Sequence, residues 1–198
     1  MHTIREAPIT QLPRLAAIDM RFTIDAVVTV APDGSGGFAL SERPVRPSVK
    51  DYDALPGNHP DDWMRDLDVR GWGLFFALDG DQRIGGALIA AGTAALSLTG
   101  GLDVACLWDL RVAPAHRGQG VGAALLRAAA AWARDRGCVR MSIETQDNNA
   151  AACRFYRRQG CTLERVDPAA YPALPGETAL YWALDITGLS EPPEQPLS

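Results

Sequence analysis

Apolar and polar positions alternate along several stretches of the chain, and this pattern predicts strands and helices. The segment Phe22–Val30 alternates and is rich in Val, Ile and Thr, which is typical of a strand. Trp72–Leu78 and Arg83–Ala91 flank the turn Asp79-Gly80-Asp81, so they predict a β-hairpin. Val121–Arg136 is rich in alanine and places larger apolar residues at helical spacing, which predicts a helix with one buried face.

The same criteria divide the rest of the chain into further short elements. Additional strands are predicted at Thr3–Ala7, Phe38–Val45, Cys106–Val112, Cys138–Glu144, Thr162–Val166 and Thr178–Ile186. Additional helical segments are predicted at Pro8–Asp19, Ser48–Asp53, Asp61–Val69 and Asn149–Gln159. The stretch Ile84–Leu102 is uncharged but holds five glycines, so two strands around a glycine-rich turn are favoured over a membrane span.

Composition and charge narrow the class of protein. The 198 residues are 47% apolar and 22% charged, which is typical of one soluble globular domain, predicted to span residues 1–186. The prolines of Thr187–Ser198 predict a disordered tail. A net charge of −5 argues against a nucleic-acid surface and is compatible with a cationic substrate. The N-terminus shows no secretory signal, so a cytoplasmic location and no membrane partner are expected.

Neither the cysteines nor the histidines form a metal-binding pattern. The four cysteines lack the paired spacing of a zinc site and are expected to be reduced: Cys106, Cys138, Cys153 and Cys161. The three histidines are widely separated along the chain: His2, His59 and His116. We therefore expect no metal site.

A glycine-rich loop between a predicted strand and a predicted helix is the stretch around which the chain is organised. The strand Cys106–Val112 is followed by the turn Ala113-Pro114, by Arg117-Gly118-Gln119-Gly120-Val121-Gly122 and by the helix. Glycines allow the backbone to approach a ligand closely, and the first N–H groups of a helix favour an anion. Arg117 adds donors suited to phosphate. We interpret this stretch as a pyrophosphate-binding loop.

Two rival motifs are excluded by the residues of this loop. A P-loop requires Gly-Lys-Ser/Thr after the glycines, and none is present. The even spacing of Gly118, Gly120 and Gly122 misfits the dinucleotide-binding fingerprint. Arg-x-x-Gly-x-Gly after a strand that ends at Val112 instead resembles the acetyl-CoA loop of the Gcn5-related N-acetyltransferase (GNAT) superfamily.

A second segment supports the same resemblance. The superfamily motif Asn-x-x-Ala-x-x-x-Tyr is matched from Asn149 to Tyr156, and Gly160 follows where the superfamily has a glycine. Cys161 replaces the usual aromatic residue, a departure expected to affect packing only. The chain is therefore identified as resembling this superfamily, which implies a single α/β (α+β) domain. Its sheet would be mixed, mostly antiparallel and six- to seven-stranded, with splayed central strands and helices on both faces.

Further elements resemble one family within the superfamily, the streptothricin acetyltransferases. Four elements of that family occur in order: Glu-Thr-Gln-Asp at 144–147, Ala-Cys-x-Phe-Tyr at 152–156, Val-Asp-x-x-x-Tyr at 166–171 and an aromatic-Trp pair at 181–182. This resemblance extends over Asp109–Ile186 and is weak before Trp72. The region between residues 20 and 70, where such enzymes usually build the acceptor site, is predicted only in outline.

The resemblance assigns the coenzyme acetyl-CoA to particular residues. The strand Asp109–Val112 would splay from Arg140–Glu144, with the pantetheine arm bonded to backbone of this strand and a strand N–H serving as oxyanion donor. The expected coenzyme-binding residues are Leu110, Arg111, Val112, Arg117, Gly118, Gln119, Gly120, Val121, Gly122, Asn149 and Tyr156. Tyr156 would also be the general acid that protonates the sulfur; the alternative is an aromatic side chain that only packs the helix on the sheet.

The general base and the acceptor site are less closely defined. Glu144 and Asp109 are the candidate bases, and for each the alternative is a structural role, with the amine losing its proton to solvent. Acceptor-side residues suited to a cation are expected at Trp108, Tyr171, Glu177, Tyr181 and Trp182. For the last four positions, the alternative is a surface loop followed by a core strand.

The predicted function is therefore transfer of acetyl from acetyl-CoA to a primary amine of a small molecule, for which the narrower resemblance suggests the β-lysyl amine of streptothricin. One alternative keeps this chemistry with another amine, amino acid or peptide as acceptor. A second is a non-catalytic sensor that binds acetyl-CoA, against which the retained Tyr156 argues. Homodimers are common in the superfamily, so a homodimer is a further expectation.

Overall fold

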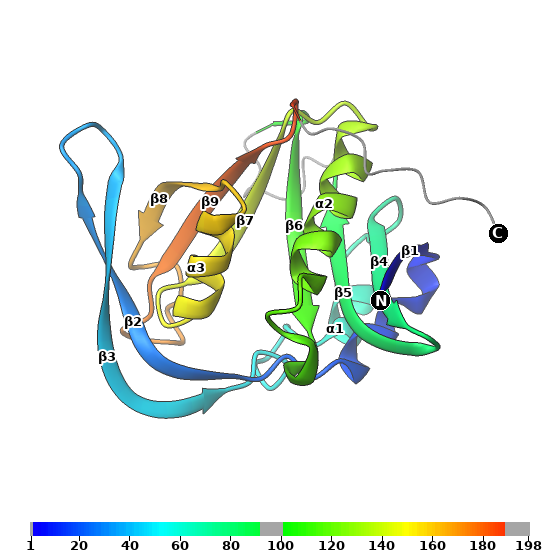
Figure 1. Ribbon diagram of the computed structural model, residues 1–198, viewed down its shortest axis with the longest axis horizontal. Coiled ribbons are helices and arrows are strands. Elements are labelled where there is room, and N and C mark those ends of the chain that lie inside the picture. Colours follow the sequence, from blue (N-terminus) through cyan, green and yellow to red (C-terminus); the bar gives the residue numbers. More distant parts are fainter. Residues whose placement is uncertain (1, 92–100, 189–198) are drawn as a thin grey trace. The chain divides into compact units, whose positions relative to one another are not determined.

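The computed structural model describes residues 2–91 and 101–188 (Figure 1), and these residues form two compact units. The first unit takes in the described residues of Met1–Met20, Asp53–Met141 and Asp185–Ser198. The second takes in Arg21–Tyr52 and Ser142–Leu184. Among the described residues, seven strands belong to one sheet and two form a separate ribbon.

The first unit contains four strands of the sheet in the order β1-β4-β5-β6, with neighbours antiparallel. Its strands are β1 (Thr3–Ala7), β4 (Gly73–Asp79), β5 (Gln82–Ala90) and β6 (Val104–Val112). Its helices are the 3₁₀ helices η1 (Ile9–Ala17) and η2 (Pro114–His116) and the α-helices α1 (Pro60–Asp66) and α2 (Val121–Arg134). β7 (Arg140–Gln146) begins in this unit and continues into the second.

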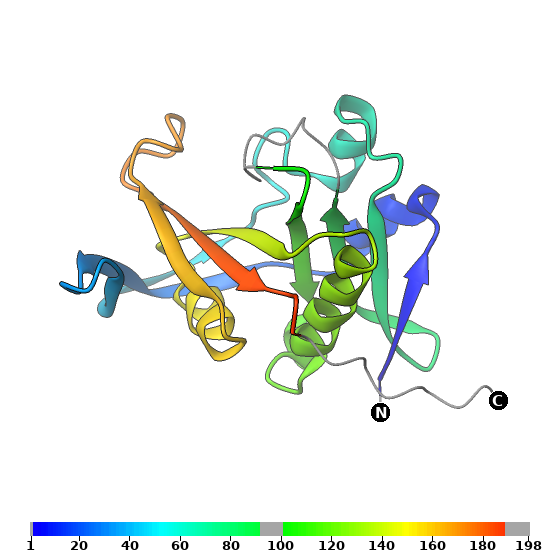
Figure 2. The same ribbon diagram turned by 90° about the horizontal axis from the view of Figure 1, so that it is seen from above.

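Helices cover both faces of these four strands, as two consecutive glycines of β5 demonstrate. Successive residues of a strand point to opposite faces of the sheet. A Cβ atom on Gly85 would lie 3.0 Å from Leu125 of α2, whereas one on Gly86 would lie 2.3 Å from Leu15 of η1. Figure 2 shows α2 and α1 on opposite sides of these strands. The prediction of helices on both faces is therefore confirmed.

Large apolar side chains fill the face of the sheet that η1 and α1 cover. The buried members of this cluster are Leu12, Leu15, Ile18, Trp63, Val69, Trp72, Leu74, Phe76, Leu88, Ala90 and Cys106. The members from β4, β5 and β6 sit at alternate positions, which is the period expected of strands with one face on this core. Burial of these side chains supplies the main stabilisation that holds η1 and α1 against the sheet.

The second unit contains the ribbon, the remaining strands and one helix. Its elements are β2 (Phe22–Pro32), β3 (Phe38–Lys50), most of β7, α3 (Ala150–Arg158), β8 (Thr162–Asp167) and β9 (Ala179–Asp185). β7, β9 and β8 follow one another in the sheet, and β8 pairs antiparallel with β9. The backbone N–H of Val28 in β2 donates to the carbonyl of Asp147, 2.8 Å away, which ties the ribbon to the end of β7.

The predicted fold class, an α/β domain with a mostly antiparallel sheet, is confirmed, but one predicted element is wrong. Ser48–Asp53 was expected to be helical, yet β3 continues to Lys50. Ser48 pairs with Ile24 and Lys50 with Phe22, so the second strand supplies backbone partners that a short helix would have to provide for itself. The segment Pro8–Asp19 forms a helix of the 3₁₀ type over Ile9–Ala17.

Some predictions fall on residues outside the described part of the chain. β5 accounts for the first of the two strands expected in Ile84–Leu102, and residues 92–100 lie outside. The predicted tail also lies outside, apart from Thr187 and Gly188. Two further expectations stay predictions. They are the domain boundary at residue 186 and the splay between Asp109–Val112 and Arg140–Glu144. No helix of the described residues is long and apolar enough to cross a membrane.

The close approach of β5 to η1 predicts that Gly86→Ala destabilises the protein. The added methyl group would lie 2.3 Å from Leu15, which is fully buried, and 3.2 Å from the carbonyl oxygen of Phe75. Overpacking of this kind costs about 1–3 kcal/mol. Urea unfolding measures the effect, with Gly188→Ala as control, because a Cβ atom at Gly188 meets nothing within 4 Å. Equal stability of the two variants would contradict the proposed packing.

Candidate active site

A β-bulge in β6 places two consecutive side chains of the predicted site. Leu88 of β5 lies opposite Asp109, but the next residue, Ile89, lies opposite Leu107, so Trp108 is the extra residue of the bulge. A bulge bends its strand and redirects side chains. It allows Trp108 to pack against the apolar cluster while Asp109 keeps its register with β5.

Trp108 belongs to a group of three tryptophans within the first unit. Its ring centroid lies 6.1 Å from that of Trp63 in an edge-on arrangement and 5.3 Å from that of Trp72 in a tilted one. Trp63 and Trp72 are buried, and Trp108 is partly exposed. Trp108 was predicted to contact the acceptor, and its rigid packing leaves part of the ring available for that role.

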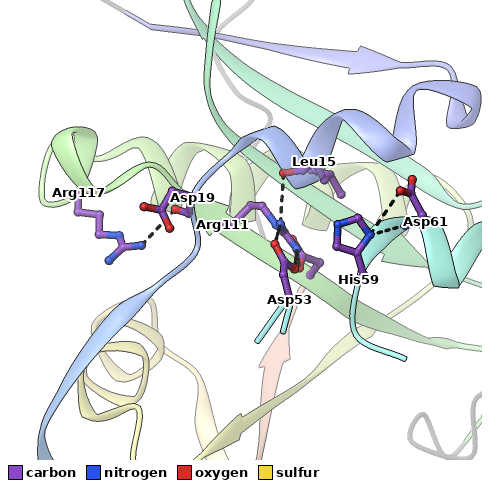
Figure 3. Close-up of polar contacts among 8 residues, drawn as sticks. Leu15, Asp19, Asp53, His59, Asp61, Arg111 and Arg117 are labelled. Carbon is purple, nitrogen blue, oxygen red and sulfur yellow. Dashed lines mark hydrogen bonds and ion pairs between the residues drawn. The ribbon is translucent and has the colours of Figure 1, made fainter. Parts of the chain in front are cut away.

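Arg111 forms an ionic cluster with Asp109 and Asp53. Figure 3 shows its contacts with Asp53 and Leu15. Its Nε and Nη2 donate to the two carboxylate oxygens of Asp109 at 2.9 and 2.7 Å. Its Nη1 and Nη2 donate to Asp53 at 2.9 and 3.2 Å, and Nη1 also donates to the carbonyl of Leu15 at 3.2 Å. The exposed fractions of the three side chains are 0% for Arg111, 6% for Asp109 and 19% for Asp53.

The charges of this cluster bear on whether Asp109 can act as a general base. Burial opposes the charge of Arg111, but the attraction and hydrogen bonds of Asp109 and Asp53 outweigh it and hold the pKa of Arg111 above its ordinary value. Both oxygens of Asp109 are engaged by this permanently charged guanidinium. Of the two interpretations offered for Asp109, base or structural residue, this geometry favours the structural one. The side chain of Arg111, which was predicted to bind coenzyme, is fully buried, and its guanidinium is occupied by Asp109, Asp53 and the carbonyl of Leu15.

The glycine-rich loop has the backbone conformation that its sequence predicts. Gly118 and Gly120 have φ angles of +75° and +83°, which only glycine adopts without strain, and a Cβ atom at either would meet nothing within 4 Å. Gly120 is the N-cap of α2, and no side chain caps this end, so the first N–H groups of a 14-residue helix are left for a ligand. These features fit a bound pyrophosphate, as the sequence predicts for residues 117–122.

Arg117 is held at the start of this loop. Its Nε donates to the carbonyl of Val112 at 2.9 Å, and its Nη2 lies 3.5 Å from the carbonyl of Asp19. Figure 3 shows its guanidinium beside Asp19, away from the cluster around Arg111. The contact with Val112 fixes the turn between β6 and α2, so it sets where the loop starts. Gln119 adds a hydrogen bond from Nε2 to the carbonyl of Ala115 at 2.9 Å.

The other group of predicted site residues lies in the second unit. Asn149 is the N-cap of α3, where its Oδ1 accepts from the N–H of Ala152 at 3.1 Å. Tyr156 lies on the same helix and is 7% exposed, with its ring centroid 5.1 Å from that of Phe155. Asn149 therefore starts the helix that carries Tyr156. Their roles toward the coenzyme stay predictions.

Glu144 and Tyr171, predicted for catalysis and for acceptor binding, are in direct contact. The hydroxyl of Tyr171 donates to Glu144 Oε1 at 2.5 Å. Burial and this hydrogen bond raise the pKa of Tyr171 above its ordinary value, so Tyr171 stays a donor. Tyr181 is linked to the same carboxylate electrostatically, since burial and then the charge of Glu144 raise its pKa. The guanidinium of Arg165 lies 3.5 Å from the ring centroid of Tyr181.

Glu177, the remaining acceptor-side prediction, is paired with a residue that the sequence analysis did not assign. Its carboxylate accepts from Lys50 Nζ, which also donates to Gln146 Oε1 at 2.6 Å. Tyr52 lies beside them, with its ring centroid 5.2 Å from the same Nζ. Lys50 and Tyr52 lie before Trp72, where the resemblance to the streptothricin acetyltransferases is weak, so the sequence analysis assigned neither residue a role.

Trp182, by contrast, is a core residue. It is 1% exposed, and its Nε1 donates to Thr145 Oγ1 at 2.9 Å. The core-strand alternative therefore describes this position. The four cysteines are free and buried, and burial raises the pKa of Cys153 to about 11 and that of Cys161 to about 12. These two thiols remain protonated near neutral pH, so neither suits a nucleophile.

Comparison with known proteins assigns the class. A model of the acetyltransferase (GNAT) family matches residues 42–161. The streptothricin acetyltransferase of Streptomyces lavendulae is 35% identical over 175 residues, which cover 86% of this chain and 87% of that protein. A streptothricin acetyltransferase from Escherichia coli is 36% identical over 149 residues, or 74% and 75% of the two chains. The chain therefore belongs to the acetyltransferase (GNAT) family, and it is an N-acetyltransferase.

Solved structures agree with this assignment. The crystal structure of a nourseothricin acetyltransferase matches with a TM-score of 0.71 and 31% identity, covering 93% of this chain and 98% of that one. A protein from Bacillus anthracis str. Ames, solved in complex with acetyl coenzyme A, has the same fold with a TM-score of 0.76 and 24% identity. That match covers 93% of this chain and 99% of the other. The predicted resemblance to the superfamily is confirmed.

The ionic cluster predicts that Arg111→Met strongly destabilises the protein. The substitution leaves the buried carboxylate of Asp109 and the partly buried carboxylate of Asp53 without their cation, which lowers the free energy of unfolding by about 3–5 kcal/mol. Urea denaturation followed by circular dichroism measures it. The control is Arg70→Met, since the pair of Arg70 with Asp68 is exposed to solvent and contributes little. If both variants unfold at the same urea concentration, the cluster does not stabilise the unit.

Proposed function

We propose that this enzyme transfers the acetyl group of acetyl-CoA to a primary amine of streptothricin, by direct attack of the amine in a ternary complex. The observation that carries the proposal is the 35% identity to a streptothricin acetyltransferase over 86% of the chain. The residues around Glu144 add chemical support, because a carboxylate flanked by tyrosines suits a cationic amine such as that of a β-lysyl group.

Acetyl-CoA supplies the activated thioester, and the chain supplies binding groups for it. The uncapped N-terminus of α2 and the N–H groups of residues 117–122 bind the pyrophosphate. Backbone groups of Leu110 and Val112 bind the pantetheine arm, and an N–H of this strand stabilises the negative charge that develops on the carbonyl oxygen. The cluster around Arg111 fixes this strand from the side of η1. Asn149 contributes a further hydrogen bond to the pantetheine arm.

Tyr156 is the general acid of the proposed reaction and donates its proton to the departing sulfur. Its burial on α3 limits exchange of that proton with bulk water. Glu144 is the general base, because it is exposed on β7 and its contact is with a neutral hydroxyl, whereas Asp109 is neutralised by Arg111. A lysine-type amine has a pKa of about 10.4 and must lose a proton before it attacks. No step of this scheme calls for a metal ion.

Replacement of Tyr156 by Phe tests the chemistry of the proposal. The substitution keeps the ring and removes the proton donor, so kcat with streptothricin as acceptor should fall about 10- to 100-fold or more. Release of free thiol from acetyl-CoA measures kcat, and calorimetry measures acetyl-CoA affinity, which should change little. An unchanged kcat would exclude Tyr156 as the acid. Loss of acetyl-CoA affinity together with kcat would assign it a packing role instead.

A further inference from the structure

Lys50 is a buried cation in the second unit whose surroundings resemble a binding site for an ammonium ion. It is the last residue of β3, and its side chain is 10% exposed. Its Nζ donates to the amide oxygen of Gln146 and to the carboxylate of Glu177, and it lies 5.2 Å from the centre of the Tyr52 ring. A carboxylate, an amide oxygen and an aromatic face together replace much of the water that an ammonium loses on burial.

Each partner of Lys50 is attached to a different part of the second unit. Gln146 ends β7, and its backbone carbonyl accepts from the N–H of Asn149 at 3.0 Å. Glu177 follows the loop that carries Tyr171, and its side chain is 20% exposed. The contact of Lys50 with Glu177 joins residues 127 positions apart in sequence. One ammonium therefore links the end of the ribbon, the end of β7 and the loop before β9.

Tyr52 extends this linkage to α3. Burial raises the pKa of Tyr52 above its ordinary value, and a hydrogen bond with the side chain of Asn149 opposes that shift. Its ring also packs against Phe22 at the start of β2, with 5.3 Å between ring centroids. Tyr52 is thus fixed on one side by the ribbon and reaches Asn149 on the other. Asn149 in turn caps the helix that carries Tyr156.

We propose that Lys50 is a positioning residue of the transferase, holding Glu177 and Gln146 directly and Asn149 through Tyr52. The proposal rests on the function proposed above, in which Asn149 binds the pantetheine arm and Tyr156 is the acid. It also changes the role of Glu177. A carboxylate already paired with an internal lysine supports the site, and the carboxylate that meets the cationic acceptor is Glu144 with its hydrogen-bonded Tyr171.

Two roles for Glu177 give opposite results when Lys50 is removed. If Glu177 binds the acceptor and Lys50 competes for it, Lys50→Met frees the carboxylate and lowers the KM for streptothricin. If Lys50 positions the site, the same variant leaves the partly buried carboxylate of Glu177 without its cation and displaces Gln146 and Tyr52. In that case kcat falls and acetyl-CoA binds more weakly, since Asn149 loses its support.

The experiment compares four variants with the wild type: Lys50→Met, Lys50→Arg, Glu177→Gln and the double variant Lys50→Met/Glu177→Gln. Each single removal should lower kcat about tenfold, because one partly buried charge loses the partner that compensates it. Lys50→Arg should recover most of kcat, since it keeps the cation. The double variant should be less impaired than the product of the single effects predicts, because it removes both charges of a coupled pair.

A matched control comes from another ion pair that joins α3 to the ribbon. Arg154 donates to Glu42 at 2.5 Å, and the two side chains are 45% and 36% exposed. Arg154→Met should leave kcat within about threefold of the wild type, because exposed pairs contribute little. A positioning role for Lys50 is overturned if Lys50→Met lowers the KM for streptothricin with kcat unchanged. It is also overturned if the two single effects simply multiply in the double variant.

Calorimetric titration with acetyl-CoA alone separates this proposal from the proposed function. If the wild type fails to acetylate streptothricin, the proposed function is wrong. The support that Lys50 gives to Asn149 can still be tested, by measuring the affinity for acetyl-CoA. Lys50→Met should then raise the Kd for acetyl-CoA about tenfold, with Lys50→Arg and Arg154→Met close to the wild type. Equal Kd values for all of these proteins would overturn the positioning role.

Discussion

The guanidinium of Arg111, paired with the carboxylates of Asp109 and Asp53, is the interaction on which the proposed coenzyme-binding part of the first unit depends. A fully buried cation is costly unless it is paired and hydrogen-bonded, and here five hydrogen bonds satisfy it. Because Asp109 follows the bulge at Trp108, the cluster fixes β6 where the strand is irregular. The same strand leads directly into the glycine-rich loop, so the position of the loop depends on it.

A different arrangement of charge characterises the second unit. There the carboxylates of Glu144 and Glu177 are each held by one strong donor, a tyrosine hydroxyl in the first case and a lysine ammonium in the second. The two acids are therefore not equivalent. The direct partner of Glu177 is the cation of Lys50, whereas the direct partner of Glu144 is the hydroxyl of Tyr171. This difference is the basis for the proposal that Glu144 serves the reaction and Glu177 supports it.

The sequence predicted the glycine-rich loop and the helix from Asn149 correctly, because both depend on local backbone chemistry. Gly118 and Gly120 adopt positive φ angles, and Asn149 caps the helix that follows it. Contacts between distant residues could not be predicted in this way. Asp53 and Arg111 are 58 positions apart, and nothing near either residue indicates its partner. The wrong helix at Ser48–Asp53 has the same origin, since only pairing with β2 makes this stretch a strand.

The proposed acceptor is streptothricin, not simple amines in general. The most direct test is release of free CoA thiol from acetyl-CoA by the purified protein, with streptothricin or an equal concentration of free lysine as acceptor. Rapid release with streptothricin and little release with lysine are expected. Release with lysine, or with neither acceptor, would contradict the proposed acceptor while leaving the fold and the family unchanged.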